Sequence, residues 1–132
     1  MIADVDSERL LCCAIAERRA TAIELELDVQ DFTCAIRRGI CAASLDGAEG
    51  ATAIVDWLYA AGMLGPVDRE IVALAQTTPS CFSRRLLVDA AIRVRDAAQR
   101  RRLADELAAI AERLRSGAIN YRQAQAELRG AA

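Results

Sequence analysis

Apolar residues recur at spacings of three and four along most of this chain, and that period predicts α-helices. A first helix is expected over residues 7–20, with Ser7 as its N-terminal cap. Its apolar face consists of Leu10, Leu11, Ala14 and Ile15. Residues 23–29 then alternate strictly between apolar and acidic side chains, a pattern typical of a half-buried strand. No second strand of similar quality follows, so we expect a short helix plus turn there and leave helix or strand open.

Carboxylates placed three residues apart indicate where the next helix begins. Asp28 with Asp31 can act as a capping pair ahead of a helical segment. The apolar positions of that segment are Phe32, Ala35, Ile36 and Ile40. Gly39 lies inside the segment, and we expect it to weaken the helix without necessarily ending it.

The same capping arrangement recurs further along the chain. Asp46 and Glu49 precede a helix that we expect over about residues 48–61. Pro66 suits the first turn of another helix, because a residue there needs no backbone N–H. Thr78 is expected to cap the helix that follows, which is the longest of the chain.

Residues 79–115 contain no glycine and no interior proline, so they predict one long helix. Its apolar positions are Leu87, Ala91, Val94 and Ala98, followed by Leu103, Leu107, Ile110 and Leu114. The apolar stripe changes phase at Arg100–Arg102, so either the helix bends there or its two halves face different neighbours. Gly117 ends this helix and Asn120 caps a last one, which makes 103–129 a helical hairpin.

These elements predict an all-α protein. We expect one domain spanning residues 1–132, a compact bundle of about six helices with one long C-terminal helix and a terminal helical hairpin. The composition agrees, since 54% of the residues are hydrophobic but only 4% are aromatic. A core of leucine, isoleucine, valine and alanine favours close contact between helices.

The residue types that are missing bear on function. The chain has no histidine and no lysine, which removes the commonest general base and the commonest metal ligand. No phosphate-binding glycine loop or nucleophile motif is visible. We therefore expect a protein that is not an enzyme, with no catalytic residue, no cofactor and no metal. The odd count of five cysteines and the lack of a leader pattern or a membrane-spanning stretch predict a soluble protein of the reducing cytoplasm.

Residues 20–39 carry the best local motif. Relative to Ala22, apolar residues follow at Leu25, Leu27, Phe32, Ala35 and Ile36. This spacing resembles a phage-repressor-type helix-turn-helix, and the resemblance implies a DNA-binding regulator, acting as a dimer. The residues that would contact DNA are Gln30, Thr33, Arg37 and Arg38. The motif departs from the family at the turn, where Glu26 replaces the usual glycine and would need a costly left-handed backbone.

The charge distribution points instead to a protein partner. Residues 1–56 hold eleven acids and five arginines, whereas residues 57–132 hold eight acids and twelve arginines, giving net charges of −6 and +4. The candidate partner-binding residues are Tyr59, Met63, Leu64, Arg84, Arg85, Arg93, Arg100 and Arg101. We interpret the chain as a protein–protein interaction module, an adaptor, small chaperone or regulator, whose partner has an acidic surface. A homodimer is an alternative, and nucleic acid is the less favoured partner.

A third alternative is a cysteine-based redox sensor. Cys81, at the start of a predicted helix near Arg84 and Arg85, is the candidate reactive thiol. Cys34 and Cys41 are seven residues apart, but no C-x-x-C pair supports a metal site. Buried free cysteines that behave as small hydrophobic residues are the commoner outcome.

Overall fold

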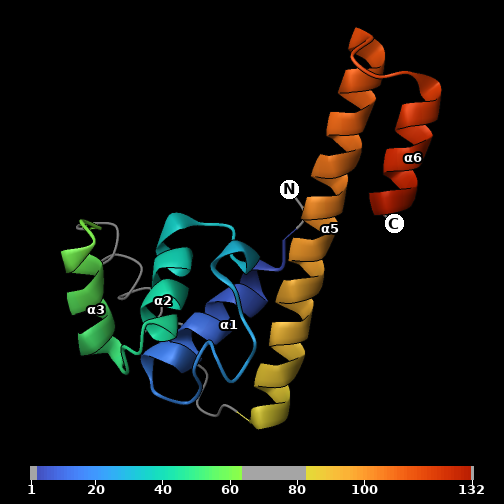
Figure 1. The fold of residues 1–132 in the computed structure, drawn as a ribbon. Helices are drawn as coiled ribbons and strands as arrows, with labels where there is room; N and C mark the ends of the chain where they lie inside the picture. The colour runs from blue at the N-terminus through green and yellow to red at the C-terminus, as the bar shows by residue number, and fades with distance from the viewer. Residues whose placement is uncertain (1–2, 64–82, 132) are drawn as a thin grey trace. The chain divides into compact units, whose positions relative to one another are not determined.

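The computed structural model describes residues 3–63 and 83–131, and every regular element in these ranges is a helix. The elements are α1 (Val5–Ala16), the 3₁₀ helix η1 (Val29–Asp31), α2 (Ala35–Leu45), α3 (Ala51–Ala60), α5 (Arg84–Ser116) and α6 (Tyr121–Ala131) (Figure 1). The predicted all-α class is confirmed, with five α-helices in the described ranges where about six were expected. The helix expected from Pro66 and the cap expected at Thr78 lie outside the described residues.

The packing divides the described chain into two units, residues 3–98 and residues 99–131. The first unit contains α1, η1, α2, α3 and the first half of α5, and it encloses the main core. The second unit is the rest of α5 together with α6. No helix of the described residues has both the length and the apolar character needed to span a membrane.

Helix α1 begins two residues before its predicted start. The backbone N–H of Ser7 donates to Oδ1 of Asp4 at 3.1 Å, so Asp4 is the cap and the prediction of Ser7 as cap was wrong. Ser7 instead lies in the first turn and is buried. The helix ends at Ala16 rather than near residue 20, because the backbone turns left-handed at Arg18.

Residues 23–29 form helical turns and not a strand. The N–H of Leu25 donates to the carbonyl of Thr21, and the N–H of Leu27 donates to the carbonyl of Ala22. Leu25 and Leu27 are buried while Glu24 and Glu26 are exposed, so the alternation in the sequence reflects a compact turn with one buried side. The predicted capping pair of Asp28 and Asp31 is present, but it caps the start of the 3₁₀ helix η1 and not the start of α2. Helix α2 begins only at Ala35.

Helices α2 and α3 pack closely at Gly39. Helix α2 continues through this glycine. A Cβ at Gly39 would lie 2.6 Å from Cδ2 of Leu58, so only glycine allows the approach of α3. The predicted cap of α3 by Asp46 was wrong: α3 begins after Gly50, and Asp46 instead accepts a hydrogen bond from Nε1 of Trp57 at 2.8 Å.

Helix α5 is continuous from Arg84 to Ser116, as Figure 1 shows, and no break interrupts it at Arg100–Arg102. In the first unit its buried residues are Leu87, Ala90, Ala91, Val94, Ala97 and Ala98. The terminal hairpin is confirmed, and so is the cap at Asn120, whose Oδ1 accepts from the N–H of Gln123 while Oε1 of Gln123 accepts from the N–H of Asn120.

Five helical segments of the described residues end in one recurring backbone motif. In each, a residue with positive φ is followed by a residue whose N–H donates to the carbonyl five positions earlier. The residues with positive φ in this motif are Arg18, Glu26, Gly47, Gly62 and Gly117. Three of the five are glycines, as this geometry prefers, and Arg18 and Glu26 adopt it with a side chain in place.

Candidate functional site

The arginines predicted to bind a partner lie on α5. Arg84, Arg85, Arg93 and Arg100 are exposed, and Arg101 is half-buried. Nη1 of Arg84 donates to Oε2 of Glu24 at 3.3 Å, in an ion pair whose two side chains are exposed. Arg95, further along α5, donates from Nη1 to the carbonyl of Leu25 at 2.7 Å. Part of the positive charge of α5 therefore fixes the turn at residues 21–27.

The apolar residues predicted to bind a partner, near the end of α3, differ from one another in exposure. Tyr59 is 46% exposed, whereas Met63 is half-buried and packs against the core. Leu64 lies outside the described residues. Trp57 is half-buried against the same core and uses its indole N–H on Asp46.

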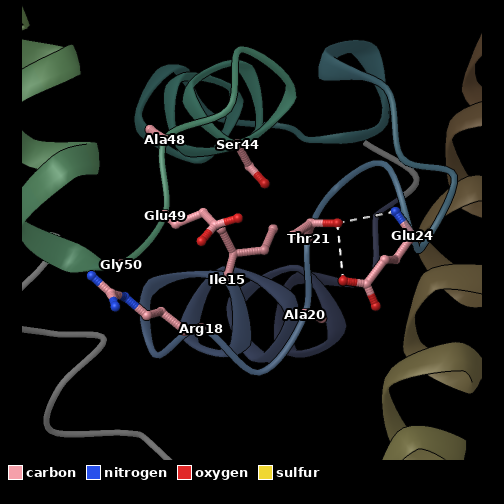
Figure 2. A pocket seen from close by; sticks show the side chains of 9 residues that line it. All are labelled: Ile15, Arg18, Ala20, Thr21, Glu24, Ser44, Ala48, Glu49 and Gly50. Carbon is pink, nitrogen blue, oxygen red and sulfur yellow. Dashed lines mark hydrogen bonds between the residues drawn. The ribbon is translucent and has the colours of Figure 1, made fainter.

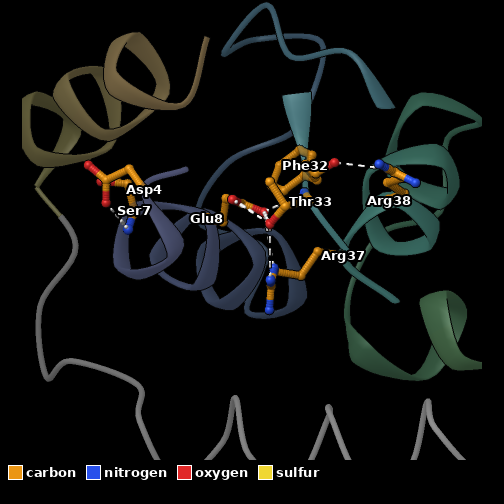
Figure 3. A network of polar contacts seen from close by, with 7 residues as sticks. All are labelled: Asp4, Ser7, Glu8, Phe32, Thr33, Arg37 and Arg38. Carbon is orange, nitrogen blue, oxygen red and sulfur yellow. Dashed lines mark hydrogen bonds and ion pairs between the residues drawn. The ribbon is translucent and has the colours of Figure 1, made fainter. Parts of the chain in front are cut away.

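Two of the four residues of the helix-turn-helix alternative belong to an internal polar network, which Figure 3 shows. Glu8 of α1 is 1% exposed, and its Oε1 accepts from the N–H of Thr33 at 2.8 Å. Nε of Arg37 donates to the same oxygen at 3.1 Å, and the Arg37 side chain is 8% exposed. A buried ion pair with these additional hydrogen bonds joins α1 to α2, so Thr33 and Arg37 lie with their polar atoms on Glu8.

The other residues of that alternative remain at the surface. Gln30 in η1 is exposed, and Arg38 is exposed while its Nε donates to the carbonyl of Phe32 at 2.9 Å. Glu26 has a φ of 55°, so the left-handed backbone that the motif requires at its turn is present at a non-glycine residue.

The four described cysteines all belong to the first unit and form no disulfide, and three of them are buried. Cys12, Cys13 and Cys41 are buried, and Cys34 is half-buried. Burial raises the pKa of the Cys12 thiol well above its ordinary value, an effect that Arg37 opposes only in part. Burial also raises the pKa of Cys41 to about 12, and Asp31 and Asp28 act in the same direction. Cys81 lies outside the described residues.

A polar cavity of about 150 Å³ lies where the end of α1 meets the turn between α2 and α3 (Figure 2). Its lining residues are Ile15, Arg18, Ala20, Thr21, Glu24, Ser44, Ala48, Glu49 and Gly50. Oγ of Ser44 accepts from the N–H of Ala22 at 3.0 Å, and Thr21 and Glu24 bond to each other. The polar groups of this cavity thus join neighbouring segments of the first unit. No cluster of three metal-ligating side chains occurs among the described residues.

The hairpin of the second unit exposes large apolar side chains on one side. Its buried side chains are Ile110 of α5 and Ala124 of α6. The exposed apolar residues, which we call the hairpin face, are Leu103 (42%), Leu107 (41%), Leu114 (42%), Tyr121 (68%) and Leu128 (41%). Such residues on one side of a small unit are the usual mark of an interaction surface.

Helix geometry assigns these residues to one side of the hairpin. The Arg113–Glu127 ion pair joins α5 to α6 along the opposite edge, where an open pocket is lined by Glu106, Ala109, Ile110, Arg113, Glu127 and Gly130. At about 100° per residue, Leu107 and Leu114 lie on the other side of Ile110 from Arg113. By the same rotation Tyr121 and Leu128 lie on the other side of Ala124 from Glu127. Two antiparallel helices joined by that ion pair therefore present one polar edge and one apolar edge.

The sequence contained a signal for this surface that the apolar period alone did not reveal. Leu103, Leu107 and Leu114 have the spacing of a core stripe, so they were interpreted as part of the packed face of the long helix. The last helix, however, supplies only a short apolar face to cover them. A comparison of the two helices would have shown that residues 103–114 contain more large apolar side chains than the last helix can cover.

Comparison of the chain with protein-family models, with curated proteins and with solved structures found no match.

Proposed function

We propose that this protein is a non-enzymatic cytoplasmic interaction module, an adaptor, small chaperone or regulator, that binds another protein through its hairpin face. The observation that carries the proposal is the exposure of Leu103, Leu107, Leu114, Tyr121 and Leu128 on one side of a two-helix unit. Covering an apolar surface of this kind with a partner is favourable at about 25 cal/mol for each Å² removed from water.

The chemistry of the first unit is in keeping with this proposal. Burial raises the pKa values of the Cys12 and Cys41 thiols, and a protonated buried thiol is a poor nucleophile and a poor redox sensor. The buried carboxylate of Glu8 accepts hydrogen bonds from Thr33 and Arg37. The DNA-binding alternative stays a hypothesis, and it draws no support from the position of Thr33 and Arg37 beside Glu8.

The proposal is tested by photo-crosslinking of the full chain inside cells. A benzophenone amino acid is placed at Leu107 or at Leu128, and a matched control carries it at Ala109, which is exposed on the polar edge. We expect a discrete adduct of defined mass from the two positions of the hairpin face. The adduct should disappear when Leu114→Gln is added, and Ala109 should give none.

Two results would contradict the proposal. One is the absence of any adduct from Leu107 and Leu128 at full expression of the protein. The other is the same set of adducts from Ala109 as from the face, since that would report random collision rather than a binding surface.

A further inference from the structure

Among the described residues 99–131, the charged residues at the outer margin of the hairpin face are arginines. Arg100 and Arg115 of α5 and Arg129 of α6 are exposed. At about 100° per residue, each falls on the outer margin of the side that carries Leu107, Leu114 and Leu128. Arg115 approaches Glu112 at 3.7 Å, but both side chains are more than 70% exposed, so this pair neutralises little of the charge.

The carboxylates of the same unit lie elsewhere. Glu106 and Glu127 lie on the polar edge with Arg113. Asp105 and Glu112 fall on the outer side of α5, turned away from α6 by the helix rotation of about 100° per residue. Among the described residues of the hairpin, the apolar face is therefore bordered by arginine and not by carboxylate.

This charge pattern selects the kind of occupant. Two copies of the hairpin placed face to face would bring Arg100, Arg115 and Arg129 of each against the same residues of the other, and like charges across an interface cost affinity. A partner with carboxylates beside its apolar residues would bind more tightly, because its charges attract the arginines that a second copy would repel. The positive net charge of residues 57–132 is in keeping with an acidic partner, and Arg100, Arg115 and Arg129 are part of that charge.

We propose that the hairpin face binds an acidic amphipathic helix, whose apolar stripe lies along the side shared by α5 and α6 and whose flanking carboxylates meet Arg100, Arg115 and Arg129. This inference rests on the proposed function and specifies its partner. Two helices that share one apolar side are completed by a third helix, which presents residues at i, i+3, i+4 and i+7. Because α6 has 11 residues, about three turns of partner helix cover the face.

The test uses the full chain and three synthetic peptides of about 14 residues, long enough for the three turns required. The peptides share one leucine stripe and carry glutamate, glutamine or lysine beside it. Fluorescence anisotropy measures their dissociation constants at low and high salt. We expect the glutamate peptide to bind at least about tenfold more tightly than the glutamine peptide, the lysine peptide to bind most weakly, and salt to reduce the difference.

Variants of the chain identify the arginines responsible. Replacing Arg100, Arg115 and Arg129 together by glutamine should make the glutamate and glutamine peptides bind equally. A matched control removes the same charge by replacing Arg9 and Arg19 of the first unit together with Arg102, which the helix rotation of about 100° per residue puts on the polar edge, and it should keep the preference for glutamate. Circular dichroism confirms that both variants retain the helix content of the original chain.

Several results would overturn the inference. Equal binding of the glutamate and glutamine peptides, or binding of neither, would do so. So would a light-scattering mass of twice 14.3 kDa that Leu107→Gln returns to the monomer value, because a second copy would then occupy the face. Sedimentation with vesicles of anionic lipid, lost in Leu107→Gln and without any preference for the glutamate peptide, would assign the face to a membrane surface.

The failure of this inference is distinguishable from failure of the proposed function. A cellular adduct at Leu107 and Leu128 without charge preference in the peptides leaves the interaction module standing and removes only the acidic helix. An adduct whose mass is that of two copies of the chain would likewise leave the interaction module standing and remove only the acidic helix. Absence of both the adduct and peptide binding removes both proposals.

Discussion

Two residues end helical segments in a conformation that their side chains disfavour. Arg18 and Glu26 have φ values of 62° and 55°, in positions where the chain elsewhere uses Gly47, Gly62 and Gly117. A left-handed backbone costs a residue with a Cβ about 1–2 kcal/mol, whereas glycine adopts it freely. The sequence flagged Glu26 through its motif but gave no such signal for Arg18, because nothing in the run 17–19 marks which residue must turn.

Replacing Glu26 by glycine should therefore stabilise the protein. The change removes an exposed ion pair with Arg95, in which the Glu26 side chain is 83% exposed, so little is lost with it. We expect the free energy of unfolding in urea to rise by about 0.5–1 kcal/mol for Glu26→Gly. The opposite change, Gly47→Ala, meets no atom within 4 Å and should lower that free energy by about 1 kcal/mol. If Glu26→Gly lowers the free energy of unfolding, then the left-handed backbone at residue 26 does not destabilise the original chain.

The buried thiol of Cys41 should make stability fall at alkaline pH. Its pKa is about 12 in the folded chain, against an ordinary value of 9.0, because burial disfavours the thiolate. Between those values the unfolded chain loses the thiol proton while the folded chain keeps it. The stabilisation is therefore complete below pH 9 and is lost as the pH rises toward 12, at up to about 1.4 kcal/mol per pH unit.

The measurement is the free energy of unfolding in urea at several pH values from about 8 to 11, for the original chain and for Cys41→Ala. The variant lacks the thiol, so its stability should decline less steeply above pH 9 even if lost packing lowers it throughout. Parallel pH profiles would show that Cys41 does not hold its proton in the folded chain.

At the scale of the helix, the apolar period predicted more than the capping residues did. The period located α2, α5 and α6 because it reports which side of a helix is buried. The caps were less certain, because a capping side chain has competing partners: Asp46 is used by Trp57, eleven residues away. The contact of Glu8 with Arg37, 29 residues apart, leaves no local pattern in the sequence at all.

Helix α2 is also the place where one methyl group should decide a packing distance. Gly39→Ala would place a Cβ 2.6 Å from Cδ2 of Leu58, a fully buried side chain that would have to shift. Alanine favours a helix over glycine by about 0.8–1 kcal/mol, but overpacking costs about 1–3 kcal/mol. We expect a net loss of about 1 kcal/mol in urea unfolding, which Leu58→Val should partly restore when combined with Gly39→Ala. A Gly39→Ala variant more stable than the original chain would mean that α2 and α3 are not held this closely.

At the scale of the whole molecule, the candidate surface was the feature least accessible from the sequence. A leucine at core spacing is buried only if a neighbouring helix covers it, and coverage is a property of two helices rather than of one. Leu107 and Leu114 are spaced as core residues but remain more than 40% exposed, because α6 covers Ile110 and leaves its neighbours open. By the helix rotation of about 100° per residue, Arg100 falls at the margin of the same face.

The same difference in coverage predicts unequal stability along the molecule. The hairpin buries Ile110 and Ala124, and the exposed Arg113–Glu127 pair adds little, whereas the core of the first unit joins side chains from α1, α2, α3 and α5. In native-state hydrogen exchange, we expect the amides of α6 to exchange at least about tenfold faster than the buried amides of α1 and α2. An acidic helical peptide bound to the hairpin face should slow α6 and leave α1 unchanged, because binding stabilises only the part that it covers. Protection of α6 as strong as that of α1 in the free chain would show that the hairpin needs no partner to complete its core.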